Sequence, residues 1–142
     1  MKSYTNLEQS KKLAEILPLE SADMTLPFRH TKDDKYLPGY VGARSYIDVY
    51  NDMIVLPGMD KEEVCKLIQP CWSLAALLDV IPYVIHKSDN EFYRLEIDKG
   101  YNDYNVWYTN NGLTINGLDV TSDNFVDACV EMIIKLQEQN LL

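Results

Sequence analysis

The sequence of 142 residues has little of the chemistry that usually marks an active site. It contains three cysteines and two histidines, and no two cysteines stand in a C-x-x-C pair. Because zinc sites need closely spaced ligands of these types, the sequence predicts no metal site. It also lacks G-x-G-x-x-G, a phosphate-binding loop and G-x-S-x-G, so we expect no cofactor and no hydrolase nucleophile of those kinds.

Basic residues are also scarce. Thirteen lysines and arginines stand against 22 aspartates and glutamates, which gives a net charge of −9, and the longest basic run is Lys11-Lys12. Binding to DNA, RNA or anionic lipid needs a basic footprint, so we expect no direct contact with nucleic acid. An acidic surface of this kind either binds a basic protein partner, in one form by imitating nucleic acid, or serves only to solvate the domain.

Long apolar runs are missing. The N-terminal residues have no unbroken apolar stretch of the kind that a signal peptide needs. No run approaches the roughly 18 apolar residues of a membrane-spanning helix. We therefore expect a cytoplasmic protein without membrane contact, in which Cys65, Cys71 and Cys129 are free thiols.

Strand patterns are present in the second half of the chain. Residues 93–98 and 104–109 alternate between apolar and polar side chains, which is the period of a half-buried strand. The Asn111-Gly112 pair accepts positive φ and predicts a tight turn into a third strand that begins at Leu113. We expect Asn116-Gly117 to bend or end that strand. The pattern predicts an antiparallel meander of three or more strands.

Helical patterns predict elements at both ends of the chain. Residues 121–124 are good cap residues, and the apolar stripe that follows predicts a C-terminal helix lying across the meander. Thr5 and Glu8 match a capping box, which predicts an N-terminal helix that ends at Pro18.

Two more helices are predicted in the middle of the chain. Asp60 and Ser73 are suitable cap residues for helices over 60–68 and 73–81. The short connection between these helices predicts a central αα-hairpin. With the meander and the terminal helices, the sequence indicates a single α+β domain over residues 1–142.

The first half of the chain holds the weakest patterns. Prolines and a charged run break the segment 19–40, for which we expect a long surface loop, with or without a short extended piece. Residues 46–50 and 53–56 are rich in aromatic and apolar side chains and favour strands.

A cysteine before an apolar helix raises the question of thiol catalysis in the stretch PCWSLAALLDVIP. A helix N-terminus lowers the pKa of a thiol, and the Cys-Trp pair resembles the nucleophile segment of papain-like peptidases. The glycine-rich approach of that family is absent, and neither His30 nor His86 stands in a recognisable motif. We therefore predict that Cys71 is a core residue and that the chain has no catalytic residue.

Candidate interaction residues lie in two places. Asn105 and Trp107 are expected on the sheet face opposite Val106, where amide and aromatic groups suit a protein interface or the stacking of a sugar or base. Three carboxylates with a four-residue spacing are expected on one face of the C-terminal helix: Asp123, Asp127 and Glu131. The alternatives stay open that helices cover both sheet faces and that the carboxylates are only solvated.

Four stretches together resemble small proteins encoded in bacterial prophages and other mobile elements. They are the tyrosine-rich meander and the segments TNLEQSKKLAEILPLESADM, PCWSLAALLDVIP and DNFVDACVEMIIKLQEQNLL. This resemblance implies a genomic setting and no activity. We expect a non-enzymatic accessory or interaction protein with a protein partner. The alternative is a small-molecule-binding, glycan-binding or hydrolytic domain with a lid formed by residues 19–40.

Overall fold

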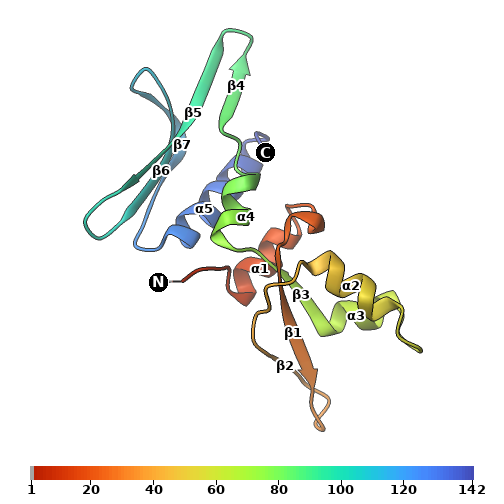
Figure 1. Cartoon of the computed structure of the whole chain (residues 1–142). Helices are drawn as coiled ribbons and strands as arrows, with labels where there is room; N and C mark the ends of the chain where they lie inside the picture. The colour runs from red at the N-terminus through yellow and green to blue at the C-terminus, as the bar shows by residue number, and fades with distance from the viewer. Residues whose placement is uncertain (1) are drawn as a thin grey trace. The chain divides into compact units, whose positions relative to one another are not determined.

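The computed structural model describes residues 2–142, which form helices and two antiparallel sheets (Figure 1). The described chain divides into two compact units. One comprises Tyr4–Ala76, and the other comprises Leu77–Leu142 with residues 2 and 3. The predicted α+β class is confirmed, while the prediction of one domain over residues 1–142 stays a prediction.

The unit formed by Leu77–Leu142 contains the predicted meander. Its elements are the end of α4 (Leu74–Val80), β4 (Val84–Ser88), β5 (Glu91–Lys99), β6 (Tyr104–Asn110), β7 (Leu113–Ser122) and α5 (Phe125–Glu138). The strands lie in the order β4-β5-β6-β7, and each pairs antiparallel with the next. Asn111 and Gly112 form the β6–β7 turn with φ of 49° and 81°, as their sequence predicts.

β7 is longer than expected and bent. Gly117 has a φ of 81°, a conformation that glycine adopts easily, and the pairing with β6 shifts register beside it. The strand then continues to Ser122. The expected bend at Asn116-Gly117 is thus present, and four more paired residues follow it, Asp119 among them.

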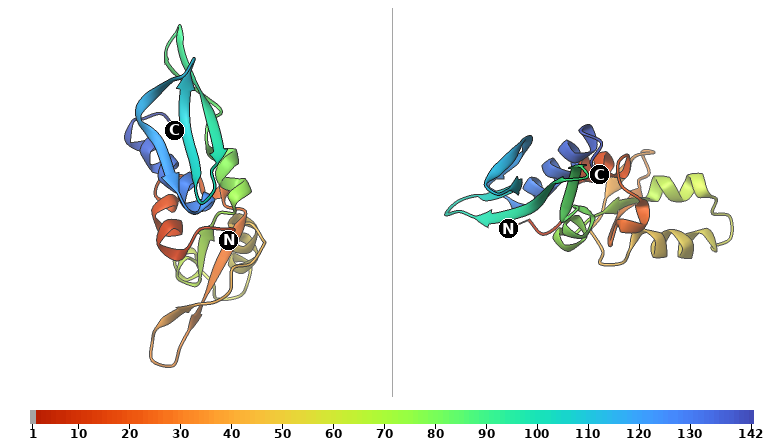
Figure 2. Two further views of the ribbon diagram at one scale, coloured as in Figure 1. Left: turned by 90° about the vertical axis from the view of Figure 1, so that its left-hand side faces the viewer. Right: turned by 90° about the horizontal axis from the view of Figure 1, so that it is seen from above.

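The C-terminal helix α5 covers one face of this sheet, as predicted, and contacts β6 and β7 (Figure 2). The Asn124 side chain caps it by accepting a hydrogen bond from the backbone N–H of Asp127 at 3.3 Å. The packing brings together buried side chains of the helix and of the strands: Val106, Tyr108, Leu118, Val120, Val126, Cys129, Val130, Ile133 and Leu136. We call the covered side the inner face and the opposite side the outer face.

The unit formed by Tyr4–Ala76 contains a smaller sheet. Its elements are α1 (Leu7–Ala14), a 3-10 turn (Leu19–Ser21), β1 (Met24–His30), β2 (Tyr36–Pro38), α2 (Tyr46–Ile54), α3 (Lys61–Leu67), β3 (Ile68–Cys71) and the start of α4. The strands lie in the order β2-β1-β3.

The N-terminal helix is confirmed, but it ends at Ala14 rather than at Pro18, and its cap differs from the predicted one by one residue. Asn6 and Gln9 form the capping box in place of Thr5 and Glu8. Thr5 is instead buried, and its hydroxyl accepts a hydrogen bond from the backbone N–H of Trp72 at 3.1 Å.

Two predictions for the first half of the chain are wrong. The segment 19–40 is not one long loop, because it holds the 3-10 turn, β1 and β2. Residues 46–50 and 53–54 lie in a helix rather than in strands. Tyr46, Val49, Tyr50 and Met53 recur at helical spacing, and Ser45 caps the helix by accepting a hydrogen bond from the backbone N–H of Asp48.

The predicted αα-hairpin is also wrong, although both of its helices exist. Asp60 and Ser73 cap α3 and α4 as expected. The residues between the helices form strand β3, which pairs with β1 through the register Met24↔Cys71 to Pro27↔Ile68. The segment between the two helices is therefore not a short turn, because it pairs with a strand more than 40 positions earlier in the chain.

Candidate functional site

The outer face of the four-stranded sheet is the candidate site. Because side chains alternate along a strand, β5 places Phe92, Arg94, Glu96 and Asp98 on this face, and all four are exposed. α5 packs on the inner face. The chemistry of the outer face is therefore that of the polar residues which the alternation directs outward.

Cross-strand pairing builds this face in rows. In one row Glu96 pairs with Trp107, which in turn pairs with Asp119. Cβ atoms of such directly opposed residues lie about 4.5–5.5 Å apart, so both carboxylates come within reach of the indole. Trp107 is half-buried, while Glu96 and Asp119 are exposed. The row thus presents one aromatic side chain between two negative charges.

The next row continues the same chemistry. Asp98 pairs with Asn105, and Asn105 pairs with Thr121. The Thr121 hydroxyl donates a hydrogen bond to the Asn105 side-chain oxygen at 2.6 Å, which orients the amide. A hollow of about 260 Å³ is lined by the members of both rows other than Glu96, and we call it the tryptophan hollow. Its polar lining consists of Asp98, Asn105, Trp107, Asp119 and Thr121.

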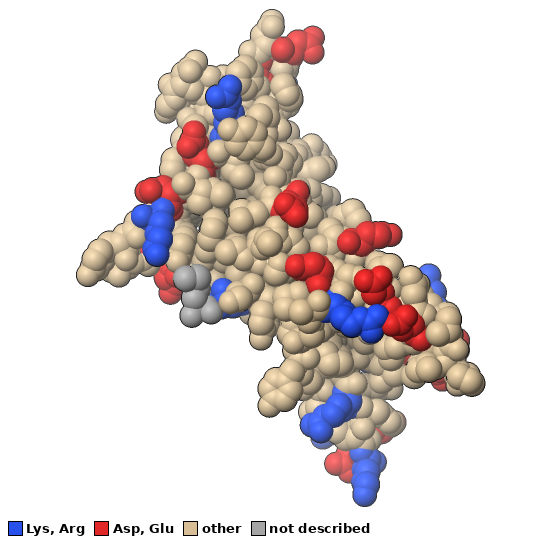
Figure 3. Space-filling model, viewed as in Figure 1, with Lys and Arg blue, Asp and Glu red and all other residues tan. Residues whose placement is uncertain are grey.

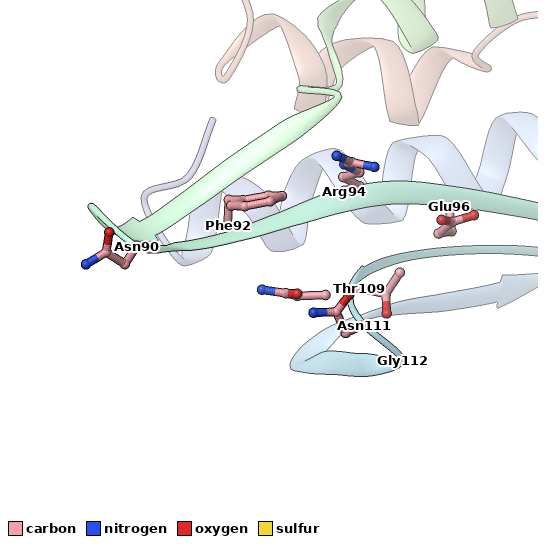
Figure 4. A pocket seen from close by; sticks show the side chains of 8 residues that line it. Asn90, Phe92, Arg94, Glu96, Thr109, Asn111 and Gly112 are labelled. Carbon is pink, nitrogen blue, oxygen red and sulfur yellow. The ribbon is translucent and has the colours of Figure 1, made fainter.

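A second hollow, of about 500 Å³, lies at the other end of the outer face, and we call it the amide hollow. Phe92, Arg94 and Glu96 of β5 lie along one side, and the β6–β7 turn lies across from them (Figure 4). Its remaining lining residues are Asn90, Thr109, Asn110, Asn111 and Gly112. The Arg94 guanidinium lies 5.7 Å from the centre of the Phe92 ring, within the range of a cation–π contact.

The charge of this unit is strongly acidic. Leu77–Leu142 with residues 2 and 3 contains eleven acidic and five basic side chains, a net −6, while Tyr4–Ala76 contains eleven and eight, a net −3. Acidic and basic side chains are interspersed on the surface that Figure 3 shows. On the outer face Glu96, Asp98 and Asp119 outnumber Arg94. The field over the tryptophan hollow therefore favours cations.

The structure brings two of the five predicted interaction residues together. Asn105 and Trp107 both line the tryptophan hollow. Glu96 and Asp119 are not among the predicted interaction residues, although the alternation of residues 93–98 places Glu96 on the same side of its strand as Arg94 and Asp98. The position of Asp119 depends on the bend of β7 at Gly117, for which the sequence offered only the Asn-Gly pair.

The three predicted carboxylates lie elsewhere. Asp127 forms an ion pair with Lys2 at 2.6 Å, and Glu131 forms one with Lys135 at 3.4 Å, both from the helix on the inner side of the sheet. Asp123 precedes the N-cap Asn124 and is not part of the helix. The prediction of three carboxylates on one helical face is therefore wrong at its first position.

The cysteines lie apart from this site. Cys71 is fully buried, as predicted, and its Sγ donates a hydrogen bond to the Thr5 carbonyl at 3.3 Å. Cys129 is also fully buried, and burial raises the pKa of its thiol to about 12. Cys65 is exposed. None of the three forms a disulfide.

The two histidines stand in different surroundings. His86 packs against the Phe92 ring, with the ring centres 6.3 Å apart. His30 Nε2 lies 2.7 Å from Asp34 Oδ1, and its ring borders a hollow of about 370 Å³ that Glu63 and Lys66 also line. Neither imidazole has a hydrogen bond to a cysteine among the interactions described for residues 2–142.

Comparison of the chain with protein-family models, with curated proteins and with solved structures finds no match. Within the part of the chain that the structure describes, no three histidine, cysteine, aspartate or glutamate side chains are grouped so that they could hold a metal ion. Over the same residues, no helix has the length and apolar character that crossing a membrane requires.

Proposed function

We propose that the protein is a non-enzymatic interaction protein whose outer face binds a basic segment of a protein partner. The observation that carries this proposal is the row Glu96–Trp107–Asp119, in which two exposed carboxylates flank an accessible indole. Tryptophan is enriched at the centres of protein interfaces, where its large ring supplies contact area and its N–H remains polar.

Lysine and arginine side chains fit this row in both charge and shape. An ammonium or guanidinium over an indole gains about 0.5–1 kcal/mol at an exposed site and about 2 kcal/mol when water is excluded. Glu96 and Asp119 add attraction from two sides, and the net charge of −6 on this unit speeds the approach of a basic partner.

A prophage or mobile-element setting is part of the same proposal and is supported by the sequence resemblance alone. The alternative of a hydrolytic or ligand-binding domain closed by a lid has less support, since β1 and β2 occupy much of the segment 19–40 in paired strands.

Fluorescence anisotropy with labelled peptides tests the proposal. A peptide rich in arginine and lysine should bind, and a glutamate-rich peptide of equal length should not. Glu96→Gln combined with Asp119→Asn should weaken binding about five- to tenfold, because two exposed charge pairs are lost. The matched control, Asp89→Asn with Glu138→Gln, removes the same charge from exposed positions outside the row and should change affinity less than about twofold.

Equal weakening by the two double variants would show that only net charge matters. Failure of the basic peptide to bind the unaltered protein at low salt would contradict the proposal directly.

A further inference from the structure

We propose that the amide hollow is a binding site for a neutral saccharide. This inference goes beyond the proposed protein interaction. Its principal residue, Phe92, lies outside the row that contains Trp107, while Glu96 belongs to that row and also lines the hollow.

The hollow arises where β5 extends beyond its pairing with β6. The pairing of β5 with β6 begins at Arg94↔Thr109, so the first residues of β5 extend past the β6–β7 turn. This overhang leaves Phe92 40% exposed, and the turn residues Asn111 and Gly112 form the opposite rim (Figure 4). The site is thus framed by two tight hairpins rather than by long loops.

The lining residues match the two kinds of surface on a sugar ring. A pyranose has a face of C–H groups that stacks on an aromatic ring. Phe92 is 40% exposed and offers the part of its ring that His86 and Arg94 leave uncovered. Its edge carries hydroxyls, which both donate and accept hydrogen bonds. Asn90, Asn110 and Asn111 each supply two N–H donors and one carbonyl acceptor, so that adjacent hydroxyls can be bound in pairs.

The charges in the hollow favour a neutral ligand. Arg94 and Glu96 lie two residues apart on the same side of β5 and offset each other. An anionic ligand would also meet the net charge of −6 of this unit, which disfavours phosphates, nucleotides and acidic sugars. A cation would meet the Arg94 guanidinium. The volume of about 500 Å³ falls within the range of known small-molecule sites.

NMR titration of the ¹⁵N-labelled protein tests the inference. The probes are glucose, galactose, mannose and N-acetylglucosamine, their disaccharides, and glucuronic acid as the anionic comparison, each up to about 10 mM. At least one neutral sugar should shift the side-chain amide signals of the three asparagines in a saturable way. Glucuronic acid should produce no saturable shift.

Variants distinguish stacking on the Phe92 ring from nonspecific binding to an exposed apolar side chain. Phe92→Ala should abolish the shifts, and Phe92→Leu, which keeps an apolar side chain but removes the ring, should abolish them as well. Tyr101→Ala is the matched control, because Tyr101 is a 99% exposed aromatic side chain in the β5–β6 turn, and it should leave binding unchanged. The inference is overturned if no neutral sugar shifts the amides, if glucuronic acid binds as well, or if Phe92→Leu and Tyr101→Ala behave alike.

Discussion

Replacement of Trp72 by alanine should destabilise the protein several times more than the same replacement of Trp107. Trp72 is fully buried, and its Nε1–H donates a hydrogen bond to the Ser21 hydroxyl at 2.9 Å. Trp107 is half-buried on the outer face, with Glu96 and Asp119 beside it. The chain has two tryptophans. They differ in the exposure of the indole to solvent, on which the proposed function depends.

The expected magnitudes follow from burial. Truncating a fully buried tryptophan to alanine costs about 3–5 kcal/mol of the free energy of unfolding, because both transfer energy and packing are lost. Truncating Trp107 removes cross-strand contacts and part of a buried surface, which costs about 0.5–1.5 kcal/mol. With a urea slope of about 1–3 kcal/mol per molar, the two midpoints should differ by about 0.5–4.5 M.

Urea denaturation followed by circular dichroism measures both values. Trp72→Phe and Trp107→Phe serve as milder controls that keep an aromatic ring. The two tryptophans belong to different units, so each free-energy change is assigned to the transition of its own unit if two transitions appear. Trp107→Ala costing as much as Trp72→Ala would show that the outer face belongs to a core, and the functional proposal would then fail.

Three further predictions concern the packing of α5 and the thiols. In urea denaturation, Ile133→Ala should lower the free energy of unfolding by about 2–5 kcal/mol, because Ile133 is fully buried. Glu131→Ala should lower it by less than about 1 kcal/mol, because Glu131 is exposed, and equal losses would mean that the helix faces the other way. A thiol reagent should label Cys65 rapidly in the native protein and Cys71 and Cys129 after denaturation, and rapid native labelling of all three would refute the burial. Since burial raises the pKa of Cys129 from 9.0 to about 12, the folded state keeps a proton that the unfolded state loses, so stability should fall by up to about 1.4 kcal/mol per pH unit above about pH 9. Cys129→Ala should flatten this fall in urea midpoints measured from about pH 8 to 11, and an unchanged slope would contradict it.

The sequence predicts the part of the fold that contains the candidate site because its signals there are local. The two-residue alternation in 93–98 and 104–109 defined the strands, and the positive-φ pair Asn111-Gly112 defined the turn between β6 and β7. The same alternation placed Asn105 and Trp107 on one face. What alternation does not supply is register across the bend of β7, and Asp119 was missed for that reason.

Prolines explain two of the wrong predictions. The expected loop contains Pro27, which lies instead in β1, where the pairing changes from β3 (Pro27↔Ile68) to β2 (Phe28↔Pro38). The expected short connection between the two central helices contains Pro70, which lies instead in the edge strand β3. Proline is tolerated at such places because its missing N–H is not required by a ladder on both sides. A single sequence does not show which strands pair on either side of these prolines.

The wrong assignment of α2 has another cause. Its aromatic and β-branched side chains favour a strand, yet Tyr46, Val49, Tyr50 and Met53 also fit a helix, and Tyr46 is buried. Tertiary burial of this face and the Ser45 cap decided the outcome.

The indole N–H signals of the two tryptophans, followed by ¹H–¹⁵N NMR, test the central claim most directly. Trp107→Phe assigns the signals by removing one of them. Titration with the arginine- and lysine-rich peptide should shift the Trp107 signal in a saturable and salt-sensitive way, because we propose that the ligand cation binds over its ring between Glu96 and Asp119. The buried Trp72 signal should stay in place. A Trp107 signal that does not move while the peptide binds would place the binding surface elsewhere and contradict the account.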